Sequence, residues 1–340
     1  MKKILILQPL SDQGLAIAKF IKQHSDNYFT IAGLKDTDPI VKSIPFFDSI
    51  EKIPSNYQIK PGEFDIIIPT GAESTNTLMQ LNESIRVGNI SFYQENLRVC
   101  DKISMLNTIN DLHIPIPETY SNADEINTFP VFYKQRFETG RGSRGLIQNK
   151  KELNTVTEDN SIFFQEFIDS PITYGVGFLA REGILIISFI QKELFSYPKP
   201  GGSGVILQIF DDPKLLEYTQ RILKKLHFNG WGLVEFKYCP KRKDYVFMEV
   251  NAKFWASIEF ALMNNPIFFQ ELFDVHYTPK KQVKCIIFLD RLAYYGILEY
   301  LKLGSLYLNC YKLHFKESIF ILILNAIPPK LKSIIKHDSI

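Results

Sequence analysis

Residues 232–257 read GLVEFKYCPKRKDYVFMEVNAKFWAS and contain the most informative pattern in the chain. The alternating runs on either side of the basic turn 241–243 predict two antiparallel strands. Because residues i and i+2 of a strand face the same side, Glu249 and Asn251 project together. An antiparallel partner strand can bring Glu235 onto that face as well.

These three side chains would form a site of hard oxygen ligands. Two carboxylates and an amide oxygen suit Mg²⁺, which binds through one or two carboxylates and keeps several waters or substrate phosphates. Lys253 continues the same alternation, so a cation would stand next to the acids. The simpler interpretation is a half-exposed hairpin whose acids face water.

A second feature is Lys134, which ends a predicted strand and precedes the segment ETGRGSRG, residues 138–145. Its three glycines would let backbone N–H groups approach a phosphate closely, with the lysine as a point charge beside them. The segment joins two strands, so it fits neither the P-loop nor the dinucleotide-binding pattern. A hairpin tip with solvated arginines is the alternative.

Length and composition limit the class of protein. At about 150 residues per domain, 340 residues predict two or three lobes. Lys plus Arg number 39 and Asp plus Glu 37, and the resulting charge of +2 is too small for the positive field that nucleic-acid binding needs. The four cysteines have no CxxC or zinc spacing, so we expect no disulfide framework, no structural zinc and a cytoplasmic location. We also expect no transmembrane segment.

The order of patterns along the chain predicts an α/β amino-terminal part followed by antiparallel sheet. Residues 3–34 alternate strand, helix and strand, as parallel α/β sheets do. The alternate prolines of residues 114–117 enforce extended chain and predict a boundary. Strand patterns then dominate up to residue 191.

Taken in this order, the features resemble the ATP-grasp superfamily, the fold of biotin carboxylase, carbamoyl phosphate synthase and D-alanine:D-alanine ligase. The resemblance covers roughly residues 1–275, and residues 232–257 are similar to the family's GxxEF…ExNxR signature. It implies an α/β protein with a Rossmann-like lobe, two α+β lobes that sandwich ATP, and a helical carboxy-terminal extension. The implied domains are a pre-ATP-grasp domain (1–95), a small lobe with the glycine-rich loop (96–168), a large lobe with the metal site (169–278) and the extension (279–340).

The resemblance also implies a role for each matching residue. Lys102 and Lys134 match the lysines that hold nucleotide phosphates. The other implied nucleotide-binding residues are Gly140, Gly142, Ser143 and Gly145 in the closing loop and Gln165, Glu166, Phe167 and Ile168 in the linker strand beside adenine. The implied metal ligands are Glu235, Glu249 and Asn251, and the implied catalytic cations are Lys253, Arg141 and Arg144. Lys253 stands where the family has arginine. Lysine keeps the positive charge but cannot donate two parallel hydrogen bonds to one phosphate, as the planar guanidinium of arginine can. For the ribose, Asp169 or Thr173 would replace the family's usual acid.

The activity implied is an ATP-dependent ligase that joins a carboxylate to an amine, or to a thiol, through an acyl phosphate and releases ADP and phosphate. ATP and Mg²⁺, with Mn²⁺ as the alternative metal, are the implied cofactors. Surface-glycan or peptide-like metabolite synthesis is the pathway that similar stand-alone ligases suggest. Three alternatives stay open: a carboxyphosphate- or carbamate-forming enzyme that uses bicarbonate, a catalytically silent nucleotide-binding scaffold, and a nicotinamide oxidoreductase. The oxidoreductase ranks last because no glycine fingerprint follows the first strand.

Residues 279–340 lie outside the resemblance. Their basic residues beside apolar ones suit peripheral docking to an anionic membrane or a protein partner. A helical cap on the protein's own core is the alternative. The expected partners are otherwise ATP and the small-molecule carboxylate and amine, with no nucleic acid, and a homodimer is left open.

Overall fold

The structure of the chain is a computed structural model. It describes residues 1–38, 43–54, 62–120, 122–137, 142–156, 161–197, 202–279, 281–289, 291 and 310–313. The chain forms two compact units. The first consists of Met1–Ile190 and Asp211–Gln282, and the second consists of Gln191–Phe210 and Val283–Ile340.

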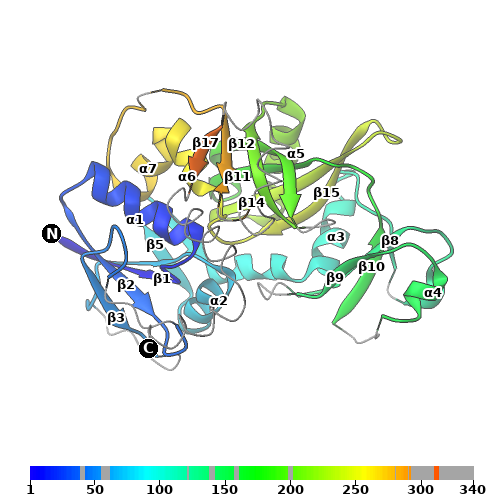
Figure 1. The fold of residues 1–340 in the computed structure, drawn as a ribbon, viewed down its shortest axis with the longest axis horizontal. Coiled ribbons are helices and arrows are strands. Elements are labelled where there is room, and N and C mark those ends of the chain that lie inside the picture. Colours follow the sequence, from blue (N-terminus) through cyan, green and yellow to red (C-terminus); the bar gives the residue numbers. More distant parts are fainter. Residues whose placement is uncertain are drawn as a thin grey trace, which may run out of the picture. The chain divides into compact units, whose positions relative to one another are not determined.

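The amino-terminal part of the first unit is a parallel sheet with helices, which confirms the β-α-β prediction (Figure 1). Its strand order is β3-β2-β1-β4, and β1 is parallel to both of its neighbours. Ile4, Leu5 and Ile6 of β1 are fully buried, as expected for a central parallel strand covered on both faces. The elements are β1 (Lys2–Leu7), α1 (Asp12–His24), β2 (Tyr28–Leu34), β3 (Ser49–Lys52), β4 (Ile66–Pro69) and α2 (Ala72–Leu81).

A short hairpin and two helical segments lead from this sheet to an antiparallel one. The antiparallel sheet, called the small sheet below, has the order β7-β10-β8-β9. One of its faces packs Val131, Ile147 and Phe164 into a core of its own. The elements are β5 (Ser84–Val87), β6 (Ile90–Tyr93), η1 (Gln94–Cys100), α3 (Lys102–Asn110), β7 (Thr119–Tyr120), η2 (Ala123–Glu125), β8 (Val131–Gln135), β9 (Arg144–Ile147), α4 (Lys150–Leu153) and β10 (Ile162–Glu166).

The rest of the first unit contains three long antiparallel strands in the order β15-β14-β11, called the large sheet below. Helix α5 buries its Leu215, Ile222 and Leu223, begins at the N-cap Asp212 and ends at His227 in the left-handed conformation. The elements are β11 (Thr173–Arg181), α5 (Pro213–Leu226), β14 (Gly230–Cys239), β15 (Asp244–Asn251), α6 (Ile258–Asn264) and α7 (Pro266–Phe273). Strand β12 (Ile184–Tyr197) begins in this unit and continues into the second.

The second unit is a sheet in which the end of β12 pairs antiparallel with β13 (Ser203–Ile209). Strand β13 pairs antiparallel with β16 (Cys285–Phe288), and β16 pairs parallel with β17 (Tyr311–Leu313). The helical extension predicted for residues 279–340 lies mostly outside the described residues, and β16 and β17 are strands. Within the ranges given above, no helix is long and apolar enough to cross a membrane.

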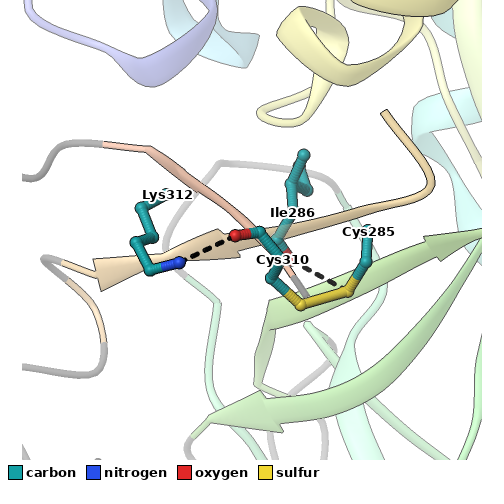
Figure 2. The surroundings of a disulfide bond; sticks show 4 residues. All are labelled: Cys285, Ile286, Cys310 and Lys312. Atoms are coloured by element: carbon teal, nitrogen blue, oxygen red, sulfur yellow. Dashed lines mark hydrogen bonds between the residues drawn. A yellow bond between two sulfur atoms is a disulfide. The ribbon is translucent and has the colours of Figure 1, made fainter. Parts of the chain in front are cut away.

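A disulfide joins Cys285, the first residue of β16, to Cys310, directly before β17 (Figure 2). The expectation of no disulfide is therefore wrong for this pair. Spacing could not reveal it, because 25 residues separate the two cysteines. The parallel pairing of Ile286 with Tyr311 places the two preceding residues side by side, with their Cα atoms 4.6 Å apart. Disulfides are rare in a reducing cytosol, so the cytoplasmic location stays a prediction.

Candidate active site

The acids predicted on the hairpin of β14 and β15 do lie together. Glu235 and Glu249 are directly opposite in the antiparallel register. Asn251 is 8% exposed, and its Nδ2 donates to Glu235 Oε1 and to Glu249 Oε1, each over 3.2 Å. The alternation of side chains along β15 thus brings two carboxylates and one amide to a single point.

The group formed by Glu235, Glu249 and Asn251 is called the acidic point below. Lys134 of the small sheet lies beside it. Its ammonium lies 3.8 Å from Glu249 Oε2 and 3.4 Å from the Met248 carbonyl oxygen, to which it donates. The residue is only 8% exposed, and the ammonium lies 5.6 Å from the centre of the Phe163 ring. A buried ammonium is stable only with such partners.

A β-bulge explains why a backbone carbonyl faces Lys134. The register of β14 with β15 shifts just after Glu235, so Phe236 pairs with Phe247 and Met248 is the extra residue. An extra residue leaves the regular ladder, and its carbonyl can then accept from another group.

The face of the small sheet that carries Lys134 has two rows of neighbouring side chains. The row through Lys134 carries the cations, and the row through Phe132 carries no charge. Lys134 pairs with Arg144 on one side and with Phe163 on the other. Two residues further along the strands, on the same face, Phe132 stands opposite Gln165. Directly opposed residues share a face, so both rows lie on the side away from the small sheet's own core.

Gln165 is unusual within that face. It is 0% exposed, and among the residues that the structure describes neither its amide nitrogen nor its amide oxygen has a hydrogen-bond partner. A buried polar group without a partner costs about 1–3 kcal/mol. Such a group calls for an explanation in strain or function.

Lys102 begins α3 beside the end of β8. Its backbone N–H donates to the Arg136 carbonyl over 3.0 Å. The side chain of the N-cap Asp101 accepts from Arg136 over 2.8 and 2.6 Å, and these bonds hold the pKa of the Asp101 carboxyl below its ordinary value. Sequence reasoning missed this pair, because nothing in the sequence relates residues 101 and 136.

The residues of the predicted linker strand face different surroundings. Glu166 donates its backbone N–H to the Glu118 carbonyl over 2.7 Å. Ile168 is buried against Val246 and Met248, and Phe167 is half-buried. Lys253 is half-buried just beyond the end of β15.

The glycine-rich loop is described only in part, since Gly140 and Arg141 lie outside the described residues. Gly142 and Ser143 are exposed, and the Ser143 carbonyl accepts from the Gln135 N–H over 3.1 Å. Gly145 pairs with Tyr133, and a Cβ there would lie 2.6 Å from the tyrosine ring. A larger residue at position 145 would therefore require the Tyr133 ring to shift.

The donor set at the acidic point fits a hard divalent cation. Among the described residues, no group of three or more His, Cys, Asp or Glu could hold a metal, so a site here needs the Asn251 amide as well as the two acids. An amide's oxygen and nitrogen exchange places when the group turns over, which would turn the Asn251 oxygen toward the carboxylates. Two carboxylates plus an amide oxygen form a set suited to Mg²⁺.

Comparisons with known proteins give the fold. No protein-family model matches the sequence, and no curated protein matches it. Pyruvate carboxylase from Rhizobium etli matches with a TM-score of 0.59 and 12% identity over 77% of this chain, which spans only 27% of that one. L-amino acid ligase from Bacillus licheniformis matches with a TM-score of 0.58 and 12% identity over 77% of this chain and 69% of that one. The biotin carboxylase domain dimer of Hydrogenobacter thermophilus 2-oxoglutarate carboxylase, solved with MgADP and bicarbonate, matches with a TM-score of 0.54 and 15% identity over 74% and 64%.

These solved structures are ATP-grasp enzymes. The chain therefore has the ATP-grasp fold, as the order of motifs along the sequence predicts.

Proposed function

We propose that this chain is an ATP-dependent ligase that joins a carboxylate to an amine through an acyl phosphate. The observation that carries the proposal is the meeting of Lys134, from the small sheet, with Glu235, Glu249 and Asn251 of the large sheet. In an ATP-grasp fold, a cation beside two acids at this junction supports a site for a metal-bound nucleotide. The L-amino acid ligase is a match whose name includes a ligase activity.

The reaction has two balanced steps. A carboxylate oxygen of the substrate attacks the γ-phosphorus of ATP, and the bond from that phosphorus to the bridging oxygen breaks to release ADP. The amine nitrogen then attacks the acyl carbon, the carbon–oxygen bond to phosphate breaks, and the amine loses a proton. Both steps bring anions together, so positioned cations would lower the barrier.

The residues would divide this work by position. Lys134 and Lys102 would hold phosphate oxygens, and Arg144 and Lys253 would neutralise charge on the transferring group, with Arg141 as a further cation. Glu235, Glu249 and Asn251 would hold the metal, which when bound supplies Lewis-acid stabilisation of phosphate oxygens. Ser143 and the loop glycines would exclude water from the acyl phosphate.

The row of the small sheet through Phe132 would receive the nucleobase. Phe132 lies two residues from Lys134, about 7 Å along the strand, and this distance would separate the base and phosphate ends of the site. Glu166, Phe167 and Ile168 would lie at the edge of this nucleobase site. The Glu166 N–H already bonds to Glu118, so we assign the base contact to other backbone atoms of this strand.

The decisive experiment measures ADP release by purified protein with MgATP, first with pooled amino acids and sugar acids and then with bicarbonate. We expect turnover that needs a carboxylate and an amine, and a loss of about 100-fold in Lys134→Ala, because a buried cation beside the phosphates has no substitute. Lys150→Ala is the matched control, since Lys150 is exposed on α4 of the same lobe. Equal activity in both variants would refute the site.

Two other outcomes separate the alternatives. Turnover that needs bicarbonate alone would favour carboxyphosphate chemistry, the second candidate, which the match solved with bicarbonate supports. Nucleotide binding without any turnover would favour a silent scaffold. A homodimer, Mn²⁺ as the metal, and peripheral docking by residues 279–340 stay predictions.

A further inference from the structure

Two segments connect the small sheet to the rest of the first unit, and they run side by side. Residues 114–118 lead into β7, and residues 166–172, which begin with the last residue of β10, lead away from the small sheet. The Glu166 N–H donates to the Glu118 carbonyl over 2.7 Å, and the Glu118 N–H donates to Glu166 Oε2 over 3.2 Å. These two connecting segments are called the crossings below. Any rotation of the small sheet relative to the large sheet must bend both of them.

One side chain of the large sheet binds both crossings. Arg242, in the turn between β14 and β15, donates from one guanidinium nitrogen to the Ile116 carbonyl over 2.8 Å and from the other to the Glu166 carboxylate. The planar fork of arginine can hold two acceptors in a fixed geometry, which a lysine cannot. The Glu166 carboxylate is therefore shared between Arg242 and the Glu118 N–H.

The hairpin of β14 and β15 makes further contacts with the crossings. The Phe247 N–H donates to the Pro115 carbonyl over 2.8 Å. Ile168 packs against Val246 in a small buried cluster. The element that bears the acidic point is thus also the element that anchors the connection to the small sheet.

We infer that Arg242 is a positioning residue that fixes the small sheet relative to β15 and so sets the distance from Lys134 to Glu249. Arg242 and Lys134 attach the small sheet near opposite ends of β15. The five residue steps from Asp244 to Glu249 span about 17 Å. A rotation of about 10° at the crossings would move Lys134 by about 3 Å, and misplacements near 1 Å can cost about 100-fold in rate.

The consequence for turnover rests on the proposed function, whereas the anchoring itself does not. The test therefore uses two measurements on the full chain: amide hydrogen exchange without nucleotide, and steady-state kinetics with MgATP. The variants are Arg242→Ala, Arg242→Lys and Glu166→Gln. Lys241→Ala is the matched control, because Lys241 is an exposed cation in the same turn.

We expect Arg242→Ala to speed exchange of the amides of Ile116, Glu118 and residues 166–168 and to lower kcat/KM for MgATP about tenfold or more. Its melting temperature should change by less than about 4 °C, because a partly exposed ion pair contributes little stability. Arg242→Lys should lose less kcat/KM than Arg242→Ala. Adding Glu166→Gln to Arg242→Ala should lower kcat/KM little further, because both substitutions remove the same ion pair between residues 242 and 166. Lys241→Ala should match the wild type.

Unchanged exchange in Arg242→Ala would overturn the anchoring. Faster exchange with unchanged kcat/KM would overturn the positioning role and leave a purely structural contact. A wild-type protein that neither binds nor hydrolyses MgATP would overturn the proposed function, and the exchange measurement would still decide whether Arg242 holds the crossings.

Discussion

Replacing Gln165 by leucine should stabilise the protein and weaken nucleotide binding. The residue is 0% exposed, and neither polar atom of its amide has a hydrogen-bond partner within the described part of the chain. Each unpaired group costs about 1–3 kcal/mol, and leucine removes both at the expense of a void of about one heavy atom, worth about 1 kcal/mol. The two groups together cost about 2–6 kcal/mol, so after the void is subtracted the free energy of unfolding should rise by about 1–5 kcal/mol.

Gln13→Leu is the matched control for Gln165→Leu. Gln13 is also a buried amide, 9% exposed, but its Nε2 donates to the Thr70 carbonyl over 2.8 Å. The same substitution there leaves an acceptor unsatisfied, so it should destabilise the protein by about 1–3 kcal/mol. Urea unfolding of the nucleotide-free variants measures both changes, and opposite signs are the expected result.

Nucleotide titration completes the experiment with Gln165→Leu. If the amide serves the nucleotide, its loss should raise the Kd for MgATP about tenfold, the equivalent of about 1.4 kcal/mol. A protein that is destabilised by Gln165→Leu as much as by Gln13→Leu would refute the reasoning, because the amide would then have a native partner. A stabilised variant with unchanged Kd would remove Gln165 from the site.

Three further predictions concern charge, metal and the disulfide. Asp101→Asn keeps an N-cap but loses the pairing with Arg136, so stability should fall by about 0.5–1 kcal/mol at pH 7. Because the pKa of Asp101 is lowered in the folded protein, that difference should shrink as the pH falls below its ordinary value of 3.8, which acid titration of both proteins measures. Addition of MgCl₂ should raise the melting temperature of the wild type but not that of Glu249→Gln, because the variant lacks one of two carboxylate ligands. Reduction of the bond between Cys285 and Cys310 should cost the second unit about 3.5 kcal/mol, the loop-closure value for their separation of 25 residues, and Cys285→Ser should abolish the effect of reductant on melting.

The acidic point could be predicted because local rules fix it. Side chains alternate along a strand, and the short basic turn between two strand patterns leaves an antiparallel partner as the natural arrangement. The observed register sets Glu235 opposite Glu249, and Asn251 bonds to both. The parallel pairing of β1 with β2 follows in the same way from a strand, helix and strand in sequence.

Contacts between distant segments could not be predicted in this way. The meeting of Lys134 with the Met248 carbonyl depends on a bulge, and no residue type in the sequence signals one. The disulfide depends on a parallel pairing of β16 with β17 that closes over a long intervening segment. The burial of the Gln165 amide likewise depends on what covers the small sheet.

The hairpin of β14 and β15 explains how a nearly neutral chain can build a strongly charged site. The net charge is only +2, yet β15 bears Glu249 at one end and the turn bears Arg242 at the other. The acids attract Lys134, and the guanidinium attracts Glu166. The small sheet therefore contributes the cation to the ion pair at one end of β15 and the anion to the ion pair at the other. Opposite pairs fix orientation as well as distance, because exchanging their positions would place like charges together. The same charges that would bind a metal and a nucleotide therefore also specify how the two sheets meet.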